Sequence, residues 1–550
     1  MLNFSYGDSK IYPGTQRDVS VYVPSAYTGD KPACLYVKLD GSTWASWNEP
    51  AVFENLIARH EMPTTIMVAV THGTIWKDKA KGEGLRYNRT YEWDSTNDNL
   101  ARFIEGELLP AVEKQVTADG KPIRISRDPN DRAIAGLSSG GIAAFTAAWQ
   151  RPDLFSRVIS TIGTFVTMRG GDEYPGLIRK TEPKHLRIFL EDGSADSWNP
   201  AFGSWWLANQ DMETALAYAD YDLAHAWGTH GHDFSVMRAI LPDVLRWVWR
   251  DWPAPVKAGF SGNSTLKEIL VPGESWQSMG SGFEAASGLA MSPNGDLVFA
   301  DAPNHIVYKL VDGREAVPLF PDGPAIGGQA FDKEGTLYAT VPTEQKIVSI
   351  DPKGARHEVA NGVRGAGITV TNSGAIFVSE PGEHSDQPSS LWLVDPAGQK
   401  TLLDSGLSSA SGIAVSPDGT LLLVAEASTK WINSYILEPD NTLQDKQRYF
   451  WLHMTDIPNN SGAEDLCFDV NGNLYIATNM GIQVADRSGR VRAILPLPTP
   501  CGPVRSICFG GPGFQTLFAT DGHRLYARKM NVKGYPPWAP PQRVQFRGWG

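Results

Sequence analysis

The chain has 550 residues, a formal net charge of −12 and four cysteines. This length exceeds what one hydrophobic core supports, so two or more domains are expected. The acidic balance is spread without long runs of one sign, which argues against nucleic acid or an anionic membrane surface as the main partner and favours a neutral or polar substrate. No stretch of about 18 apolar residues occurs, so no membrane-spanning segment is expected.

The cysteines and the N-terminus bear on the cellular compartment. Cys34, Cys467, Cys501 and Cys508 are too few and too scattered for a disulfide framework or a zinc site. We expect buried free thiols, with a bridge between Cys501 and Cys508 as the alternative. Residues 1–7 lack the basic region and apolar core of a signal peptide. Our expectation is a secreted or periplasmic protein whose signal peptide is absent from this sequence.

Strand-like apolar runs alternate with helical ones between residues 19 and 252, which is typical of an α/β sheet. The expected strands cover residues 19–23, 34–39, 65–70, 132–135, 158–162 and 186–190, and the expected helices cover 52–58, 99–116, 141–149 and 241–249. Pro, Gly, Ser and Asn then dominate residues 251–265, which indicates a linker. We place the boundary near residue 258, giving domains 1–258 and 259–550.

Beyond the linker, an apolar strand, a turn ending in glycine and a second apolar strand recur. The turn glycines are Gly295, Gly335, Gly374, Gly419, Gly472 and Gly513, at spacings of 40, 39, 45, 53 and 41 residues. This spacing is the length of a four-stranded blade, and six copies predict a six-bladed β-propeller. An irregular β-sandwich, the alternative, would not repeat one hairpin at this period.

The five residues Gly136-Leu137-Ser138-Ser139-Gly140 join an expected strand to an expected helix. A G-x-S-x-G pattern in this context is typical of the nucleophile elbow of an α/β-hydrolase, in which a tight turn exposes the serine hydroxyl. The pattern predicts acyl transfer with Ser138 as the nucleophile. The five residues alone are weak evidence, so the interpretation depends on finding partners for the serine.

A serine nucleophile needs a histidine base and a carboxylate that orients it, and in α/β-hydrolases they follow in the order Ser, acid, His. The loop after the strand at 186–190 offers Asp196, which we prefer, and Asp192, the alternative, which lies early enough to be a strand-end or turn residue. The loop before the last helix offers His232, which we prefer, and His230 as the alternative.

An oxyanion hole requires two backbone donors, one of them the amide of the residue after the nucleophile, Ser139. The Ser42 amide, after Gly41 at the end of an early strand, is the candidate for the second, although an ordinary turn is the alternative. Several tryptophans lie on or near the loops that adjoin these strand ends and could stack on a sugar or an aromatic acyl group: Trp44, Trp47, Trp93, Trp198, Trp205 and Trp206. We take Trp44 and Trp198 as substrate-binding candidates.

Residues 39–44, 89–94, 103–110 and the elbow together resemble the Putative esterase family, which groups enterochelin, feruloyl and acetylxylan esterases with mycolyltransferases. The resemblance extends over about residues 10 to 250. It implies Asp196 and His232 as the catalytic acid and histidine and Ser42 as an oxyanion-hole residue. Arg89, in the second of these segments, is our third substrate-binding candidate.

The second half resembles the gluconolactonase (senescence marker protein) family at residues 412–419, 473–484 and 509–511. The resemblance implies a divalent ion on the propeller axis, held by Glu, Asn and Asp. Here Ser287, Ser411 and Glu464 stand at those places, and calcium prefers six or more oxygen ligands that include carboxylates. We therefore expect no metal and no other cofactor, and interpret the propeller as a degenerate lactonase scaffold that shapes, caps or recognises substrate.

The sequence thus predicts an α/β-hydrolase domain followed by a six-bladed propeller, and a serine carboxylesterase that hydrolyses carbohydrate-linked acetyl or feruloyl esters. One alternative is a metal-dependent lactonase with the propeller as the active half. Another is a siderophore esterase of the enterochelin type. A non-catalytic binding protein would require the serine, histidine and acid to be coincidental.

Overall fold

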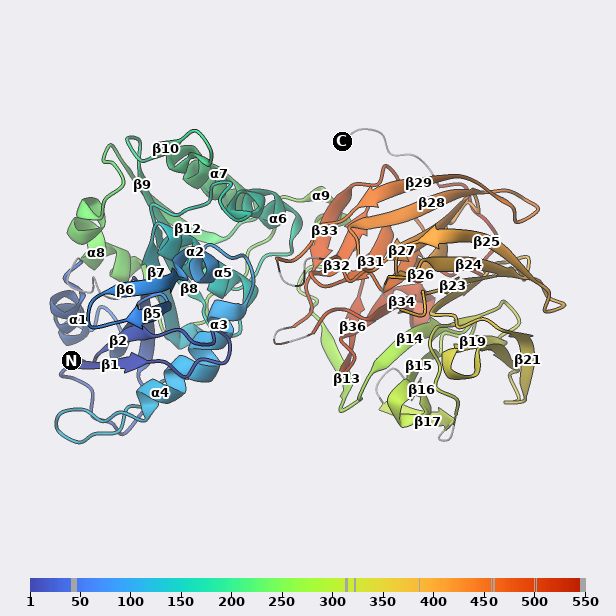
Figure 1. Cartoon of the computed structure of the whole chain (residues 1–550), viewed down its shortest axis with the longest axis horizontal. Coiled ribbons are helices and arrows are strands. Elements are labelled where there is room, and N and C mark those ends of the chain that lie inside the picture. Colours follow the sequence, from blue (N-terminus) through green and yellow to red (C-terminus); the bar gives the residue numbers. More distant parts are fainter. Residues whose placement is uncertain are drawn as a thin grey trace. The chain divides into compact units, whose positions relative to one another are not determined.

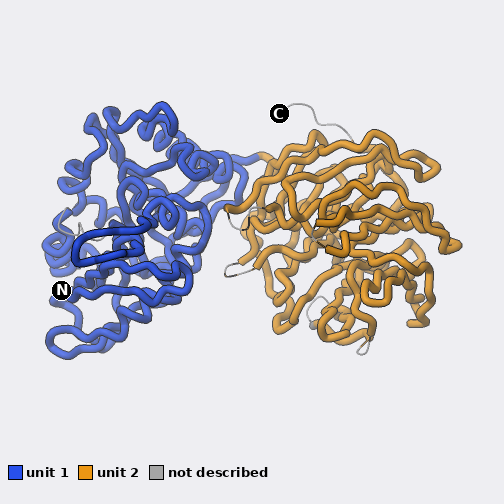
Figure 2. The backbone as a smooth tube through the Cα atoms, viewed as in Figure 1, with its two compact units in different colours: residues 1–263 blue, residues 264–550 orange. Residues whose placement is uncertain are grey.

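The structure is a computed structural model that describes residues 1–40, 47–311, 315–320, 323–384, 386–456, 458, 460–498, 500 and 502–544. It divides the chain into two compact units, residues 1–263 and 264–550 (Figure 2). The division falls a few residues beyond the boundary expected near residue 258. Among the described residues, no helix combines the length and the apolar character needed to cross a bilayer.

An eight-stranded sheet forms the centre of the first unit, in the order β1-β2-β4-β3-β7-β8-β9-β12. Its strands are β1 (Leu2–Tyr6), β2 (Arg17–Tyr22), β3 (Cys34–Leu39), β4 (Thr65–Val70), β7 (Arg132–Leu137), β8 (Arg157–Thr161), β9 (Arg187–Gly193) and β12 (Asp222–Gly228). The strands from β4 to β12 run parallel, whereas β1 and β2 pair antiparallel. Parallel strands bring the loops at their carboxyl ends to one edge of the sheet, where ligand-binding groups collect.

Helices cover both faces of this sheet (Figure 1). Helices α1 (Glu49–Ala58) and α8 (Ser235–Val248) share one apolar cluster with the sheet, and α5 (Ser139–Gln150) packs on β3, β7 and β8. The remaining helices are α2 (Arg89–Trp93), α3 (Asn99–Phe103), α4 (Leu109–Glu113), α6 (Tyr174–Lys180) and α7 (Trp205–Tyr218). Two short hairpins lie outside the sheet, β5 (Thr74–Asp78) with β6 (Glu83–Tyr87) and β10 (Trp198–Asn199) with β11 (Gly203–Ser204). Strands buried on both faces explain the continuous apolar runs in the sequence.

The first unit differs from the expected elements in several places; β1, α6 and α7, for example, were not expected. The last helix begins at Ser235, six residues before the expected start at residue 241, and has Pro242 in its interior. The helix expected over residues 99–116 ends at Glu113 and contains a π-helical turn, Ile104–Leu108. Strand β12 was not expected, because as an edge strand it is half-buried and lacks an apolar run.

The second unit is a six-bladed propeller that begins after α9 (Ser264–Ile269). Four consecutive blades are β14 (Ala286–Met291) to β17 (Glu315–Phe320), β18 (Gln329–Phe331) to β21 (Arg356–Asn361), β22 (Gly367–Val370) to β25 (Lys400–Leu407) and β26 (Ala410–Val415) to β29 (Leu443–Trp451). The fifth runs from β30 (Asp465–Asp469) to β33 (Val491–Leu495) and gains β37 (Gly534–Tyr535). The last blade combines β34 (Ser506–Gly510), β35 (Thr516–Thr520) and β36 (Arg524–Lys529) with β13 (Gln277–Ser281), which closes the ring with an early strand.

The strands between those ends complete the blades. They are β15 (Leu297–Asp301), β16 (Ile306–Val311), β19 (Leu337–Val341), β20 (Lys346–Ile350), β23 (Ile376–Glu380), β24 (Ser389–Val394), β27 (Leu421–Glu426), β28 (Trp431–Leu437), β31 (Leu474–Thr478) and β32 (Gly481–Ala485). All six predicted turn glycines have positive φ, from 66° at Gly513 to 87° at Gly335. Glycine adopts this conformation readily, which explains its recurrence and confirms the predicted six-bladed fold.

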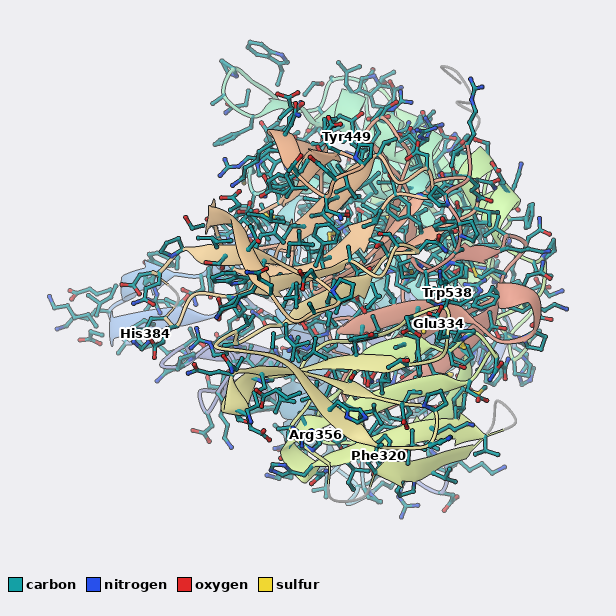
Figure 3. The ribbon with its side chains drawn as sticks, turned by 90° about the vertical axis from the view of Figure 1, so that its right-hand side faces the viewer. Phe320, Glu334, Arg356, His384, Tyr449 and Trp538 are labelled. Carbon is teal, nitrogen blue, oxygen red and sulfur yellow. The ribbon has the colours of Figure 1, made fainter. Side chains whose placement is uncertain are left out.

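The segment that follows β37 lies at the propeller channel. Tyr535, Pro536, Pro537 and Trp538 line a cavity of about 110 Å³ together with the innermost strands of all six blades. The Asn372 Nδ2 group donates a hydrogen bond of 2.9 Å to the carbonyl oxygen of Trp538, which Figure 3 labels. Cys34, Cys467 and Cys508 carry free thiols, while Cys501 lies outside the described residues.

Candidate active site

Ser138 lies in a strained turn between β7 and α5, with φ 56° and ψ −123°. Few residues other than glycine adopt such angles, which cost on the order of 1–3 kcal/mol and cluster at functional sites. A Cβ atom at Gly136 would lie 2.2 Å from the carbonyl oxygen of Gly140, and one at Gly141 would lie 2.8 Å from Ser160 Oγ. The turn therefore requires glycine at both places, in agreement with the predicted nucleophile elbow.

The structure brings together the three side chains that the sequence analysis preferred. The hydroxyl Oγ of Ser138 lies 2.9 Å from Nε2 of His232, and Nδ1 of His232 lies 2.5 Å from Oδ1 of Asp196. The three residues follow the carboxyl ends of β7, β12 and β9, so the parallel sheet places them at one edge. Such a chain of contacts can transfer the hydroxyl proton to the imidazole and stabilise the imidazolium that forms.

The surroundings of Asp196 favour its charged form. Burial by itself would raise the pKa of Asp196, but hydrogen bonds from His232, from Asp192 and from the Ser197 amide outweigh it and lower that pKa below its usual range. The side chain of Asp196 is fully buried, whereas that of His232 remains 30% exposed. The lowered pKa favours the ionised form of Asp196, and the partly exposed imidazole of His232 is accessible to a substrate.

The two alternatives, Asp192 and His230, make other contacts. Asp192 accepts hydrogen bonds from the Gly193 amide at 2.6 Å and from Asn209 Nδ2 at 2.9 Å, and burial raises its pKa. His230 lies with Nε2 2.7 Å from Oε1 of Glu191. Within the described part of the chain, Ser138 Oγ contacts His232 and Thr164 and neither of the two alternatives.

Sequence reasoning missed Thr164, which lies beside Ser138, whereas it had named Trp205 among the tryptophan candidates. Thr164 Oγ1 lies 3.4 Å from Ser138 Oγ and accepts a hydrogen bond of 3.1 Å from Nε1 of Trp205. The Trp205 ring lies edge-on to the His232 imidazole, with the ring centroids 6.0 Å apart. Thr164 follows β8, the strand beside β7, and that adjacency in a parallel sheet was the available signal for it.

The candidate oxyanion hole is described in part. Ser139 is the first residue of α5, where helix amides lack partners within the helix and the helix dipole favours negative charge. Ser42 and Trp44, two further predicted site residues, lie outside the described residues. Asp40, the last described residue before them, has φ 63° and its Oδ2 would lie 3.3 Å from a Cβ atom at Gly140. The end of β3 therefore packs directly against the elbow.

Arg89, a predicted substrate-binding residue, joins these two elements. Its Nη2 and Nε groups donate hydrogen bonds to Asp40 at 2.9 and 3.3 Å, and its Nη1 group donates one to Ser139 Oγ at 2.8 Å. The side chain keeps 34% of its surface exposed. In the structure Arg89 therefore bridges the end of β3 and the start of α5, and part of its guanidinium remains open to solvent.

Trp198 is the most exposed of the five tryptophan candidates for which the structure gives a position, with 71% of its surface accessible. It lies on the β10–β11 hairpin, two residues after Asp196. Trp47, Trp93 and Trp205 are buried, and Trp206 packs edge-on against Trp227 at 5.5 Å. Among the described tryptophan candidates, Trp198 alone combines a place beside Asp196 with a largely exposed ring.

The residues at the expected metal positions of the propeller do not fit a divalent cation. The Glu464 carboxylate is paired with the guanidinium of Arg505, and Ser411 Oγ donates a hydrogen bond of 2.5 Å to the Ala463 carbonyl. Ser287 lies in β14 opposite Ala300. Within the described residues, no group of three or more His, Cys, Asp and Glu side chains is arranged to hold a metal ion. Glu464 is the one acidic residue at the three expected metal positions, and the Arg505 guanidinium already neutralises its carboxylate.

Two family models match separate parts of the chain. Residues 11–240 match the family described as "Putative esterase", and residues 360–523 match the SMP-30/Gluconolactonase/LRE-like region. The first half of the chain is thus similar to the Putative esterase family, and the second half is similar to the gluconolactonase-like region. This result confirms the predicted resemblances and the predicted fold class, and it supports a hydrolase that acts on esters.

The propeller is similar to a gluconolactonase from Zymomonas mobilis subsp. mobilis, at 24% identity over 277 residues, which cover 43% of this chain and 76% of that protein. A gluconolactonase structure from Xanthomonas campestris matches with a TM-score of 0.43 and 20% identity, covering 49% of this chain and 93% of that one. The enterobactin esterase structure from Shigella flexneri matches with a TM-score of 0.35 and 23% identity, covering 45% of this chain and 59% of that one.

Proposed function

We propose that the esterase domain is a serine carboxylesterase with Ser138 as nucleophile, His232 as general base and acid, and Asp196 as the group that orients the imidazole. The observation that carries the proposal is the unbroken chain from Ser138 Oγ through His232 to Asp196, with steps of 2.9 and 2.5 Å. The strained turn at Ser138 supports it independently, because a backbone of this kind persists only where the surrounding structure holds it.

In the proposed reaction, Ser138 Oγ attacks the ester carbonyl carbon while its proton passes to Nε2 of His232. The tetrahedral oxyanion accepts hydrogen bonds from the amides of Ser139 and Ser42, at the positively polarised end of α5. When the C–O bond to the alcohol breaks, His232 returns the proton to the leaving oxygen. Water, deprotonated by His232, then attacks the acyl-serine ester and releases the acid.

The proposed substrates are acetyl or feruloyl esters of carbohydrates. The exposed ring of Trp198, on the loop that follows Asp196, supports this choice because such a ring can stack on a sugar or on an aromatic acyl group. Trp44 is proposed for the same role and Arg89 for a polar contact with substrate. The siderophore ester remains the competing substrate in the test below.

The propeller is proposed as an accessory domain without lactonase chemistry of its own. The pairing of Glu464 with Arg505 supports this, because a cation already neutralises the carboxylate at the expected metal position. Full-length Ser138→Ala protein should open gluconolactone no faster with added calcium than with EDTA. Calcium-dependent opening by that variant would contradict the accessory role.

The substrate is tested by measuring hydrolysis of acetylated xylan, methyl ferulate and a catecholate siderophore ester side by side. We expect the highest kcat/KM on a carbohydrate-derived ester, and we expect Ser138→Ala to abolish hydrolysis of all three. Preference for the siderophore ester would overturn the substrate assignment alone. Full activity of the Ser138→Ala variant would overturn the serine mechanism.

A further inference from the structure

A second histidine–carboxylate pair, His230 with Glu191, lies close to the proposed triad. Nε2 of His230 is 2.7 Å from Oε1 of Glu191, and the two side chains are 9% and 0% exposed. Glu191 lies near the carboxyl end of β9, and His230 lies on the loop after β12. Buried ionisable groups of this kind are costly unless they are paired, so the contact requires a purpose in the fold or the reaction.

Both strand ends are shaped to admit the His230 ring. A Cβ atom at Gly193, the last residue of β9, would lie 2.7 Å from Nδ1 of His230, and one at Gly228, the last residue of β12, would lie 2.6 Å from it. Neither glycine has positive φ in this structure, so space and not conformation requires them. The ring therefore occupies a slot that two glycines leave open.

Main-chain hydrogen bonds link this slot to both triad loops. The Ala195 amide, next to Asp196, donates a hydrogen bond of 3.2 Å to the carbonyl oxygen of His230, and the Ser194 amide donates one of 3.0 Å to that of Gly228. His230 lies two residues before His232 on the same loop. A displacement of His230 would thus move the supports of both His232 and Asp196.

We propose that Glu191 and His230 form a positioning pair that fixes the loops of Asp196 and His232 relative to each other, so that the two side chains stay in contact. This inference rests on the proposed function. The pair touches no reacting atom and acts through those two loops. It gives a role to His230, the histidine that does not contact the nucleophile, and to a buried carboxyl group that the esterase mechanism leaves unused.

The charges around the pair favour retention of a proton on it. Three carboxyl groups act electrostatically on Glu191: Asp192, its neighbour on β9, Asp196 on the loop after β9, and Asp233 on the loop after β12. Burial, and then the negative charges of Asp196 and Asp233, raise the pKa of Glu191 to about 8. The 2.7 Å contact lacks hydrogen-bond geometry, because both carboxyl oxygens of Glu191 and both ring nitrogens of His230 are buried without a hydrogen-bond partner. A neutral glutamine at position 191 can keep this close polar contact with the imidazole, whereas an apolar residue cannot.

The test compares four variants of the full chain. Glu191→Leu and His230→Phe keep side-chain volume but remove the polar contact, and each should lower kcat on a simple aryl ester by about 100-fold with little change in KM, because a displacement near 1 Å costs this much. The double variant should be no worse than either single one. Glu191→Gln should restore most of kcat. Retention of activity by His230→Phe would show that packing alone matters and would overturn the pair.

A matched control comes from β12, the strand before the His230 loop, where Nδ1 of His225 lies 3.8 Å from Oε1 of Glu213 and both side chains are partly exposed. His225→Phe should leave kcat unchanged. An activity-independent measurement separates this inference from the proposed function: the low-field N–H proton resonance of the His232–Asp196 contact should be sharp in the wild-type protein and broadened in Glu191→Leu. An unchanged resonance in that variant refutes the positioning pair, whereas unchanged hydrolysis by Ser138→Ala refutes the serine mechanism.

Discussion

The contact between Asp196 and His232 permits a quantitative prediction for Asp196→Asn. This carboxylate lies 2.5 Å from the imidazole Nδ1 atom and its side chain is fully buried. With charge centres about 4 Å apart and an effective dielectric constant of about 20, the carboxylate stabilises an imidazolium by about 4 kcal/mol. Loss of that interaction corresponds to about 10³-fold in kcat, and a wrong imidazole tautomer adds to it.

Steady-state hydrolysis of p-nitrophenyl acetate by the purified full chain measures this effect. The loss should fall on kcat and leave KM nearly unchanged, because Asp196 contacts the histidine and not the substrate. Asp211→Asn is the matched control, since Asp211 is an exposed carboxylate on α7 that pairs with Arg179. If Asp196→Asn retained more than about a tenth of the wild-type kcat, the electrostatic reasoning would be refuted, because replacing the acid of a working triad by Asn lowers kcat by several orders of magnitude.

Three further outcomes follow from the structure. Gly136→Ala places a Cβ atom 2.2 Å from the Gly140 carbonyl oxygen, so thermal melting should show a loss of stability of at least about 3 kcal/mol; an unchanged Tm would mean that the elbow is not strained as described. Arg89→Lys cannot keep both hydrogen bonds to Asp40, so kcat should fall roughly tenfold, and KM should rise because Arg89 is also proposed to contact the substrate; an unchanged kcat would show that the bridge from Asp40 to Ser139 does not position the elbow. Glu191 has a folded pKa of about 8, above the unfolded value of about 4.3. The folded state therefore holds the extra proton between those values, and stability is lost as pH rises through that window, by up to about 5 kcal/mol. Urea unfolding at several pH values measures the free energy of unfolding of the wild type and of Glu191→Gln. The wild type should become less stable relative to Glu191→Gln as pH rises, and a difference that stays constant with pH would refute the raised pKa.

Local patterns were enough to predict both architectures. The alternation of apolar strands and helices in the first half, and the turn glycines repeated at near-constant spacing in the second, arise from short-range constraints that each segment carries by itself. They failed where the local signal was weak: β12 is half-buried and lacks an apolar run, and the last helix starts at Ser235 although it was expected to start at residue 241.

The candidate site divides in the same way. The chain order of serine, acid and histidine follows from the sequence alone, because the order of strands in the α/β-hydrolase fold dictates it. Which of two neighbouring histidines reaches Ser138 depends on packing, because the His230 ring lies against Gly193 and Gly228, whereas His232 Nε2 lies 2.9 Å from Ser138 Oγ. The contacts of Glu191 and Thr164 are equally invisible in the sequence, because each is made by strands that become neighbours only when the sheet forms.

The sequence by itself therefore determined the two folds and the kinds of side chain available for chemistry. Only the tertiary structure decided their distances, the pairing of Glu464 with Arg505 and the bridge that Arg89 makes from Asp40 to Ser139. The physical reason is range. Periodicity and turn chemistry act over a few residues along the chain, whereas hydrogen bonds, ion pairs and burial act between atoms a few ångströms apart in space, and for these residues that proximity arises only on folding.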